Sequence, residues 1–128
     1  MSTSEATILI VEDDAAFAYA VQRHLEMHHY RVIAVGSSME ALKQFEQQHV
    51  DLVITDIRLL KGEPHGLSLA RTIRNAKPRI PVILVTAYPE LLAGETSLPG
   101  LVFNKPVELT TLRNAVKACV GTSPSPSS

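Results

Sequence analysis

Short apolar runs recur along the chain, separated by segments in which apolar residues are spaced for a helix. A run that is continuously apolar, rather than alternating with polar residues, is typical of a strand covered on both faces, as in a parallel sheet. Such runs predict five strands, at residues 7–11, 31–35, 52–55, 81–86 and 101–104.

Four helical segments follow these strands, and the first is marked by Phe17, Val21 and Leu25. The second begins with a capping-box pattern, in which Ser37 is followed by Glu40. The third and the last have apolar residues at helical spacing, namely Leu67, Ala70 and Ile73, and Leu109, Leu112, Val116 and Val120. Because strands and helices alternate, we predict one α/β domain with an open, doubly wound sheet of five parallel strands and helices on both faces.

Two regions depart from this alternation. Between the fourth and fifth strands, Pro89, Gly94, Pro99 and Gly100 leave room for one short helix, so the fourth helix is predicted to be short or unwound. The end of the chain, 122–128, contains only Ser, Pro and Thr and predicts a disordered tail or the start of a linker. The folded domain is therefore predicted to span 1–121.

Composition narrows the class of partner. The 128 residues are 45% hydrophobic, which suits one domain with one core, and the formal net charge is −1. A balanced charge gives no electrostatic basis for binding nucleic acid or an anionic membrane, and neither is an expected partner.

Three features of the sequence bear on location. Cys119 is the only cysteine, no apolar run is long enough to cross a bilayer, and no signal peptide is evident, so we expect a cytoplasmic location.

Chemically active side chains follow the predicted strands. Glu12 and Asp13 follow the first strand, Asp56 the third, Thr86 ends the fourth, and Lys105 follows the fifth. In open α/β sheets, ligands bind at the carboxyl ends of the strands, so these side chains should meet at one edge. Carboxylate oxygens suit a hard cation such as Mg²⁺, lysine suits phosphate, and a carboxylate can act as the nucleophile that forms an aspartyl-phosphate.

Taken singly, each of these residues has a simpler interpretation. Asp13 or Asp14 could be a helix N-cap, and Asp56 could cap a turn. Thr86 could be an ordinary strand residue, and Lys105 a solvated surface charge. Their shared position at one edge of the sheet is what favours a functional site over these alternatives.

The sequence resembles the receiver domains of two-component response regulators. Residues 8–14, Ile-Leu-Ile-Val-Glu-Asp-Asp, are similar to the family's first strand and acidic cluster, and residues 52–56 to the strand that ends in its phosphoacceptor. Val-Thr-Ala at 85–87 resembles the strand with the switch hydroxyl, and Asn-Lys-Pro at 104–106 the lysine–proline motif, whose peptide bond is usually cis. The resemblance covers about residues 6–120 and implies a flavodoxin-like fold.

The resemblance also implies roles for the edge residues. The implied Mg²⁺ ligands are Glu12, Asp13, Asp56 and the backbone carbonyl of Arg58. Asp56 would take a phosphoryl group from a histidine kinase or histidine phosphotransfer protein, Lys105 would offset charge on that group, and Thr86 would move to bond it. No organic cofactor is implied, and the chain would be a signalling domain whose only chemistry is self-phosphorylation and autodephosphorylation.

The region before the lysine departs from the family pattern. The switch aromatic of the family corresponds to Val102 here, and alternation along a strand should point the neighbouring Phe103 to the opposite face of the sheet. The interval from Thr86 to Lys105 is also a few residues shorter than usual, which again predicts a truncated fourth helix.

The surroundings of the phosphoacceptor depart too. The position usually taken by proline after it is Leu60, and the glycine comes late, at Gly66, which suggests a two-residue insertion. Arg58 and Tyr88 lie two residues past the phosphoacceptor and the threonine, at positions that in the family flank the phosphoryl site and tune its lifetime.

Other functions remain to be weighed. A phosphohydrolase with an aspartate nucleophile needs a second acid where this chain has Arg58. A degenerate receiver that binds a partner without phosphorylation is the main alternative. His24 and His28 have the helical spacing of a metal pair, but no third ligand is evident, and ordinary surface or packing histidines are the better interpretation. A homodimer, a downstream effector domain, the cognate kinase and whether the chain is part of a longer protein are left open.

Overall fold

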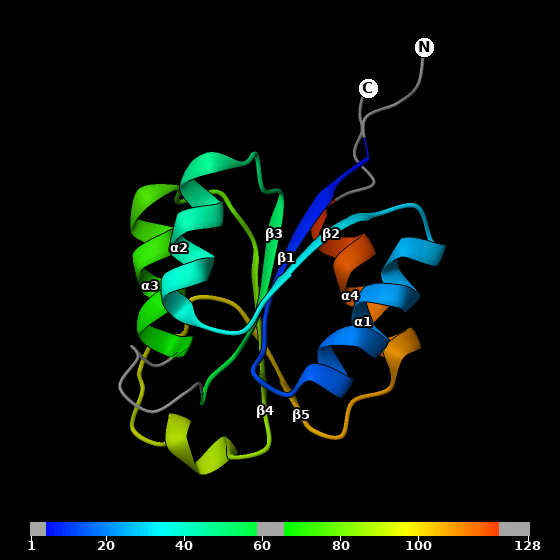
Figure 1. The fold of residues 1–128 in the computed structure, drawn as a ribbon. Helices are drawn as coiled ribbons and strands as arrows, with labels where there is room; N and C mark the ends of the chain where they lie inside the picture. Colours follow the sequence, from blue (N-terminus) through cyan, green and yellow to red (C-terminus); the bar gives the residue numbers. More distant parts are fainter. Residues whose placement is uncertain (1–4, 59–65, 121–128) are drawn as a thin grey trace.

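The computed structural model describes residues 5–58 and 66–120, in which strands and helices alternate as the sequence predicts (Figure 1). The strands are β1 (Thr7–Val11), β2 (Arg31–Val35), β3 (Leu52–Asp56), β4 (Val82–Thr86) and β5 (Leu101–Asn104). The helices are α1 (Ala15–Met27), α2 (Ser38–Gln47), α3 (Gly66–Ala76), α4 (Leu109–Val120) and the short 3₁₀ helix η1 (Pro89–Leu92). The predicted tail at 122–128 and the predicted insertion around Leu60 lie outside the described residues.

All five strands are parallel and form one sheet in the order β2-β1-β3-β4-β5. Helices α1 and α4 cover one face, and α2 and α3 cover the other (Figure 1). The strand order reverses next to β1, so the carboxyl ends of β1 and β3 border the crevice in which ligands of such sheets bind. The predicted open, doubly wound architecture is confirmed.

Alternating side chains of the central strands supply two separate cores. In β1, Leu9 and Val11 face the core under α2 and α3, whereas Ile8 and Ile10 face the core under α1 and α4. All five residues of β1, β3 and β4 are buried, which explains why their sequences are continuously apolar. Their carboxyl ends are consequently held firmly in place.

Side-chain caps set where the helices begin. Asp14 caps α1 by accepting hydrogen bonds from the backbone N–H groups of Ala16 (3.1 Å) and Phe17 (3.2 Å). Ser37 caps α2 by accepting from the N–H of Glu40 at 3.2 Å, as predicted. The Glu40 carboxylate in turn accepts a hydrogen bond, at 3.3 Å, from the N–H of Gly36, the residue before the cap.

The connection from β4 to β5 contains only the short η1, so the prediction of a short or unwound fourth helix is confirmed. Two arginines of α3 bind this connection: Arg71 contacts the Glu95 carboxylate at 2.6 Å and the Ser97 carbonyl at 3.1 Å, and Arg74 contacts the Pro99 carbonyl at 2.8 Å. Hydrogen bonds from α3 therefore hold this connection in place. A full amphipathic helix at the same position would have packed against the protein through its apolar face.

Among the described residues, none of the helices has both the length and the apolar character needed to span a bilayer.

Candidate functional site

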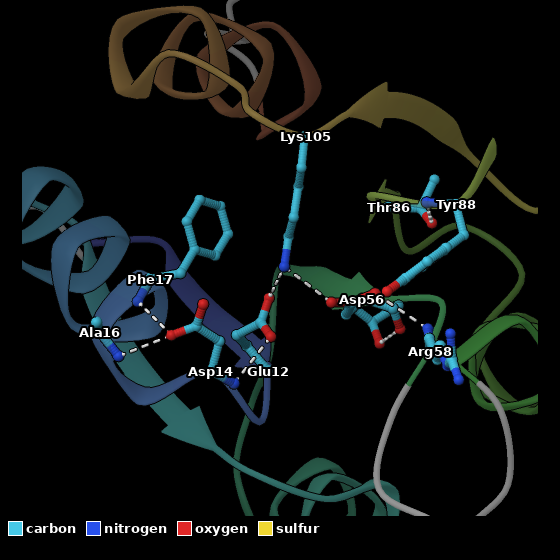
Figure 2. Close-up of polar contacts among 10 residues, drawn as sticks. Glu12, Asp14, Ala16, Phe17, Asp56, Arg58, Thr86, Tyr88 and Lys105 are labelled. Carbon is cyan, nitrogen blue, oxygen red and sulfur yellow. Dashed lines mark hydrogen bonds and ion pairs between the residues drawn. The ribbon is translucent and has the colours of Figure 1, made fainter.

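Three of the predicted edge residues meet through the ammonium group of Lys105. Glu12 directly follows β1, Asp56 ends β3, and Lys105 directly follows β5. The Lys105 Nζ donates to Glu12 Oε1 at 2.8 Å and to Asp56 Oδ2 at 2.9 Å (Figure 2). The backbone N–H of Lys105 donates to the Thr86 carbonyl at 2.8 Å, and the Lys105–Pro106 peptide is cis, as the resemblance implied. The edge therefore joins the ends of β1, β3 and β5.

Glu12, Asp13 and Asp56 form an acidic cluster at this edge. Each offers one carboxylate oxygen, and these oxygens lie within 4.8 Å of one another. Glu12 and Asp56 are only 4% and 8% exposed, whereas Asp13 is exposed. Carboxylates are rarely buried without a cation nearby, and within residues 5–58 and 66–120 the two buried ones share a single ammonium group, that of Lys105. Three converging carboxylate oxygens match the hard-oxygen coordination that Mg²⁺ requires.

The second carboxylate oxygen of Glu12 and of Asp56 has a backbone partner. The N–H of Asp14 donates to Glu12 Oε2 at 3.0 Å, and the N–H of Arg58 donates to Asp56 Oδ1 at 3.0 Å. Both Asp56 oxygens are therefore fixed, one by a backbone donor and the other by Lys105. This holds the carboxylate in one orientation at the end of a buried strand.

Burial shifts the pKa values of Glu12 and Lys105. It is the main cause that raises the pKa of Glu12, and the neighbouring Asp56 charge adds to it against the opposing effect of the Lys105 and Asp14 hydrogen bonds. Repulsion between the clustered carboxylates thus acts on the pKa of Glu12 in the same direction as desolvation, and desolvation is the larger cause. Burial alone would lower the pKa of Lys105, but its bonds to Glu12 and Asp56 outweigh that and raise it.

Thr86, which the resemblance implied as the switch residue, is buried and already hydrogen-bonded. Thr86 has no exposed surface, and its Oγ1 accepts a hydrogen bond from the N–H of Tyr88 at 2.8 Å. The Arg58 guanidinium lies over the Tyr88 ring, 4.7 Å from its centroid. The sequence marked Arg58 and Tyr88 as neighbours of the site but not their stacking, which joins two loops far apart in the chain.

One residue of the site was missed by the sequence analysis. The ring of Phe17 lies beside Lys105, with Nζ 4.6 Å from the ring centroid (Figure 2). Helical spacing assigned Phe17 to the apolar stripe of the first helix, and it does pack against the core under α1 and α4. No local signal distinguishes a core phenylalanine from one that also contacts a lysine 88 positions later.

The expected departure before Lys105 is confirmed. Val102 packs against the core under α2 and α3, whereas Phe103 packs against the core under α1 and α4. The two side chains thus lie on opposite faces of the sheet, and Phe103 does not replace the missing switch aromatic.

The paired histidines do not form a metal site with a third ligand in the part of the chain that the structure describes. Their ring centroids are 5.0 Å apart, and His28 Nδ1 lies 3.3 Å from Nη1 of Arg113 on α4. The acidic cluster is the one group of three or more metal-binding side chains found within residues 5–58 and 66–120. His24 is half-buried and His28 is exposed, which agrees with ordinary packing and surface histidines.

Comparisons with known proteins agree with the fold. The family model described as "Response regulator receiver domain" matches residues 8–117. The transcriptional regulatory protein GlrR of Escherichia coli K12 is 31% identical over 119 residues, which cover 91% of this chain and 26% of GlrR. The chain thus spans about a quarter of the length of that relative.

Solved structures are similar over most of the chain. The response regulator TrrA from Thermotoga maritima, solved in complex with Mg²⁺-BeF, is 30% identical, with a TM-score of 0.80 over 89% of this chain and 98% of TrrA. A CheY-like receiver domain protein from Methanospirillum hungatei JF-1 is 27% identical, with a TM-score of 0.78 over 91% of this chain and 94% of that one.

Proposed function

This chain belongs to the response regulator receiver domain family, and we propose that Asp56 is its phosphoacceptor. As a receiver domain it functions in two-component signal transduction. The observation that carries the assignment is the position of Asp56: it ends a fully buried strand, its carboxylate is oriented by Arg58 N–H and Lys105, and it lies within the acidic cluster.

The acidic cluster suits the Mg²⁺ ion that receiver domains bind. We propose that Glu12, Asp13 and Asp56 hold it together with the backbone carbonyl of Arg58. The donor set supports this, because its converging side-chain ligands are all carboxylate oxygens. Bound Mg²⁺ would offset the negative charge of the transferring phosphoryl group. TrrA, at 30% identity, was solved with Mg²⁺-BeF, which is consistent with the proposal.

Phosphoryl transfer requires little more from the chain than positioning and charge. An oxygen of Asp56 forms the bond to phosphorus while the P–N bond to the donor histidine breaks; the leaving imidazole keeps the bonding pair and takes up a proton. Lys105 keeps an ammonium group 2.9 Å from Asp56 Oδ2, where it can bind a phosphoryl oxygen. The donor is a histidine kinase or a histidine phosphotransfer protein. Self-phosphorylation from small donors and autodephosphorylation complete the chemistry we propose.

The proposed switch uses Thr86. For its Oγ1 to bond the phosphoryl group, the hydroxyl must turn from its present position, where it accepts from the Tyr88 N–H. The change would therefore reach the connection that begins at Tyr88. Any output through a further domain would be a property of a longer protein. GlrR is such a longer relative, because the match to this chain covers 26% of its length.

Labelling tests the acceptor directly. Intact-mass and peptide mass spectrometry after incubation with acetyl phosphate and Mg²⁺ should show one acid- and base-labile phosphoryl group in the wild type and none in Asp56→Asn. Asp51→Asn is the matched control, because Asp51 lies at the opposite end of β3, where it accepts from Thr7 N–H at 2.8 Å. A label that persists in Asp56→Asn and maps to another acid would contradict the assignment.

The alternative is a receiver that binds its partner without phosphorylation. Val102 in place of the switch aromatic, and η1 in place of a full helix, are the observations that favour it. Absence of any label in the wild type, with Mg²⁺ present, would support this alternative. A phosphohydrolase is disfavoured, because the position of its second acid is occupied by Arg58, whose side chain stacks on Tyr88.

A further inference from the structure

Among the described residues, the ammonium group of Lys105 contacts two acids and one aromatic ring. Glu12 and Asp56 accept its hydrogen bonds at 2.8 Å and 2.9 Å, and the third neighbour is the ring of Phe17, 4.6 Å from Nζ (Figure 2). The phosphoryl-transfer chemistry proposed above assigns no part to Phe17. An uncharged ring beside the ammonium group that binds both buried acids requires an explanation of its own.

The position of the Phe17 ring is fixed from two sides. Its backbone N–H bonds to the Asp14 carboxylate, so the ring projects from the capped first turn of α1. The ring is half-buried and packs against the core under α1 and α4. Helix cap and core together place the ring, and they do so independently of the acids at the edge.

Lysine needs such a contact more than the other residues of the site. Its ammonium is a compact charge on a flexible four-carbon stem, whereas Glu12 and Asp56 are held at the ends of buried strands. An aromatic face attracts a cation through its quadrupole without accepting a conventional hydrogen bond. The ring therefore restrains Nζ without competing with Glu12, Asp56 or a phosphoryl oxygen for its N–H groups.

We propose that Phe17 is a positioning residue that holds the Lys105 ammonium beside Asp56 for the phosphoryl group. This rests on the proposed function, in which Lys105 binds that group. In the present structure Glu12 shares the restraint of Nζ, but Glu12 is also a proposed metal ligand. Once Glu12 binds a cation, Lys105 has one acid fewer, and the contact with Phe17 becomes the restraint that remains beside Asp56.

Two variants separate the effect of the aromatic ring from that of its packing. Phe17→Leu removes the ring but keeps an apolar side chain, whereas Phe17→Tyr keeps the ring. We expect Phe17→Leu to weaken binding of the phosphoryl mimic beryllofluoride, at saturating Mg²⁺, about three- to fivefold. Phe17→Tyr should stay within about twofold of the wild type, because it keeps an aromatic face. Mg²⁺ affinity without beryllofluoride should change less than beryllofluoride affinity in Phe17→Leu, because Phe17 contacts Lys105 and is not in the acidic cluster.

A spectroscopic measurement reports the contact without any ligand. In the wild type, the ring current of Phe17 should shift the NMR signals of the Lys105 Hε and Nζ groups, and the shift should vanish in Phe17→Leu. Phe45→Leu is the matched control, because its ring lies under Lys77, 5.2 Å from that Nζ, in the other core. It should leave both the Lys105 signals and beryllofluoride affinity unchanged.

Three outcomes distinguish the proposals. Unchanged beryllofluoride affinity in Phe17→Leu, with Asp56 still labelled, would overturn the positioning role alone. A wild type that binds neither phosphoryl group nor beryllofluoride would overturn the proposed function and this role with it, even if the ring-current shift were present. If Phe17→Leu unfolds, pentafluorophenylalanine at position 17 keeps the shape and reverses the quadrupole. It should weaken beryllofluoride binding about as much as leucine; wild-type affinity would overturn the role.

Discussion

The two sides of the functional edge are attached to the protein in different ways. Around β1 and β3, the side chains that carry Glu12 and Asp56 into place are buried and apolar, and they pack under helices on both faces of the sheet. After β4, the chain from Tyr88 to Gly100 makes one short 3₁₀ helix and is bound by hydrogen bonds from Arg71 and Arg74.

This difference separates a fixed part of the site from a part that can be rearranged. Apolar burial resists local change, because moving one packed side chain disturbs its neighbours. Hydrogen bonds at the surface can be exchanged one at a time, often for bonds to water. The connection is not loosely held, however, since Leu92 also packs against the core under α2 and α3. We therefore expect acceptor and metal functions on the first side and conformational response on the second.

The largest effect should come from removing a charge on the fixed side. Asp13→Asn deletes one carboxylate of the acidic cluster, and a charge about 4 Å from a cation contributes about 1–4 kcal/mol per unit of cation charge. We expect Mg²⁺ binding, measured by titration calorimetry, to weaken at least about fivefold and phosphoryl labelling to stop. Without metal, thermal stability should stay the same or rise, because repulsion within the cluster is relieved.

Asp14→Asn is the matched control for this change. Asn also caps helices well, and Asp14 is not in the acidic cluster. Its effect on Mg²⁺ affinity should be clearly smaller. Labelling that survives in Asp13→Asn would remove Asp13 from the metal site.

Two glycines allow the two sides to be disturbed separately. A Cβ at Gly66 would overlap the carbonyl of Asp56, and a Cβ at Gly100 would overlap the carbonyl of Val82. Each change to Ala should lower the free energy of unfolding, measured with denaturant, by about 1–3 kcal/mol. Only Gly66→Ala should also slow labelling, because it displaces the backbone of the acceptor. Equal loss of labelling in Gly100→Ala would argue against two separable sides.

Much of this comparison could be predicted from the sequence. The continuous apolar runs indicated the strands, and strand ends in a parallel sheet share an edge, so Glu12, Asp56 and Lys105 could be placed together from their positions in the chain. Pro and Gly content likewise predicted the lost helix. What could not be predicted depends on side-chain reach between distant segments: Lys105 to Phe17, Arg58 to Tyr88, and Arg74 to Pro99. Sequence periodicity assigns a residue to a face but not to a partner.

Hydrogen exchange with and without Mg²⁺ and beryllofluoride tests the responsive side. If Thr86 turns toward the bound mimic, the Tyr88 N–H loses its acceptor, and amides from 87 to 100 should change protection severalfold. Amides of β1 and β3 should change little. Asp56→Asn is the control that should remove the response. Protection changes confined to the surroundings of Asp56 would show that the connection does not carry the signal.

The smallest effects should come from the two arginines of α3, and their order is itself a test. Arg74 donates to a carbonyl, Pro99 O, in a partly buried contact, so Arg74→Gln should lower the free energy of unfolding by about 1–2 kcal/mol.

The side chains of Arg71 and Glu95 are 45% and 32% exposed, so their ion pair should contribute about 0.2–1 kcal/mol and weaken as salt is added. Glu95→Gln removes the charge but leaves the Arg71 bond to Ser97 O, and Arg71→Gln removes both. In denaturant titrations at low and high salt, Glu95→Gln should therefore approach the wild type as salt rises, whereas Arg71→Gln should keep a residual loss. If Arg71→Gln costs more stability than Arg74→Gln at every salt concentration, the two bonds of Arg71 together, rather than the partly buried bond of Arg74 to the Pro99 carbonyl, are the main attachment of the connection.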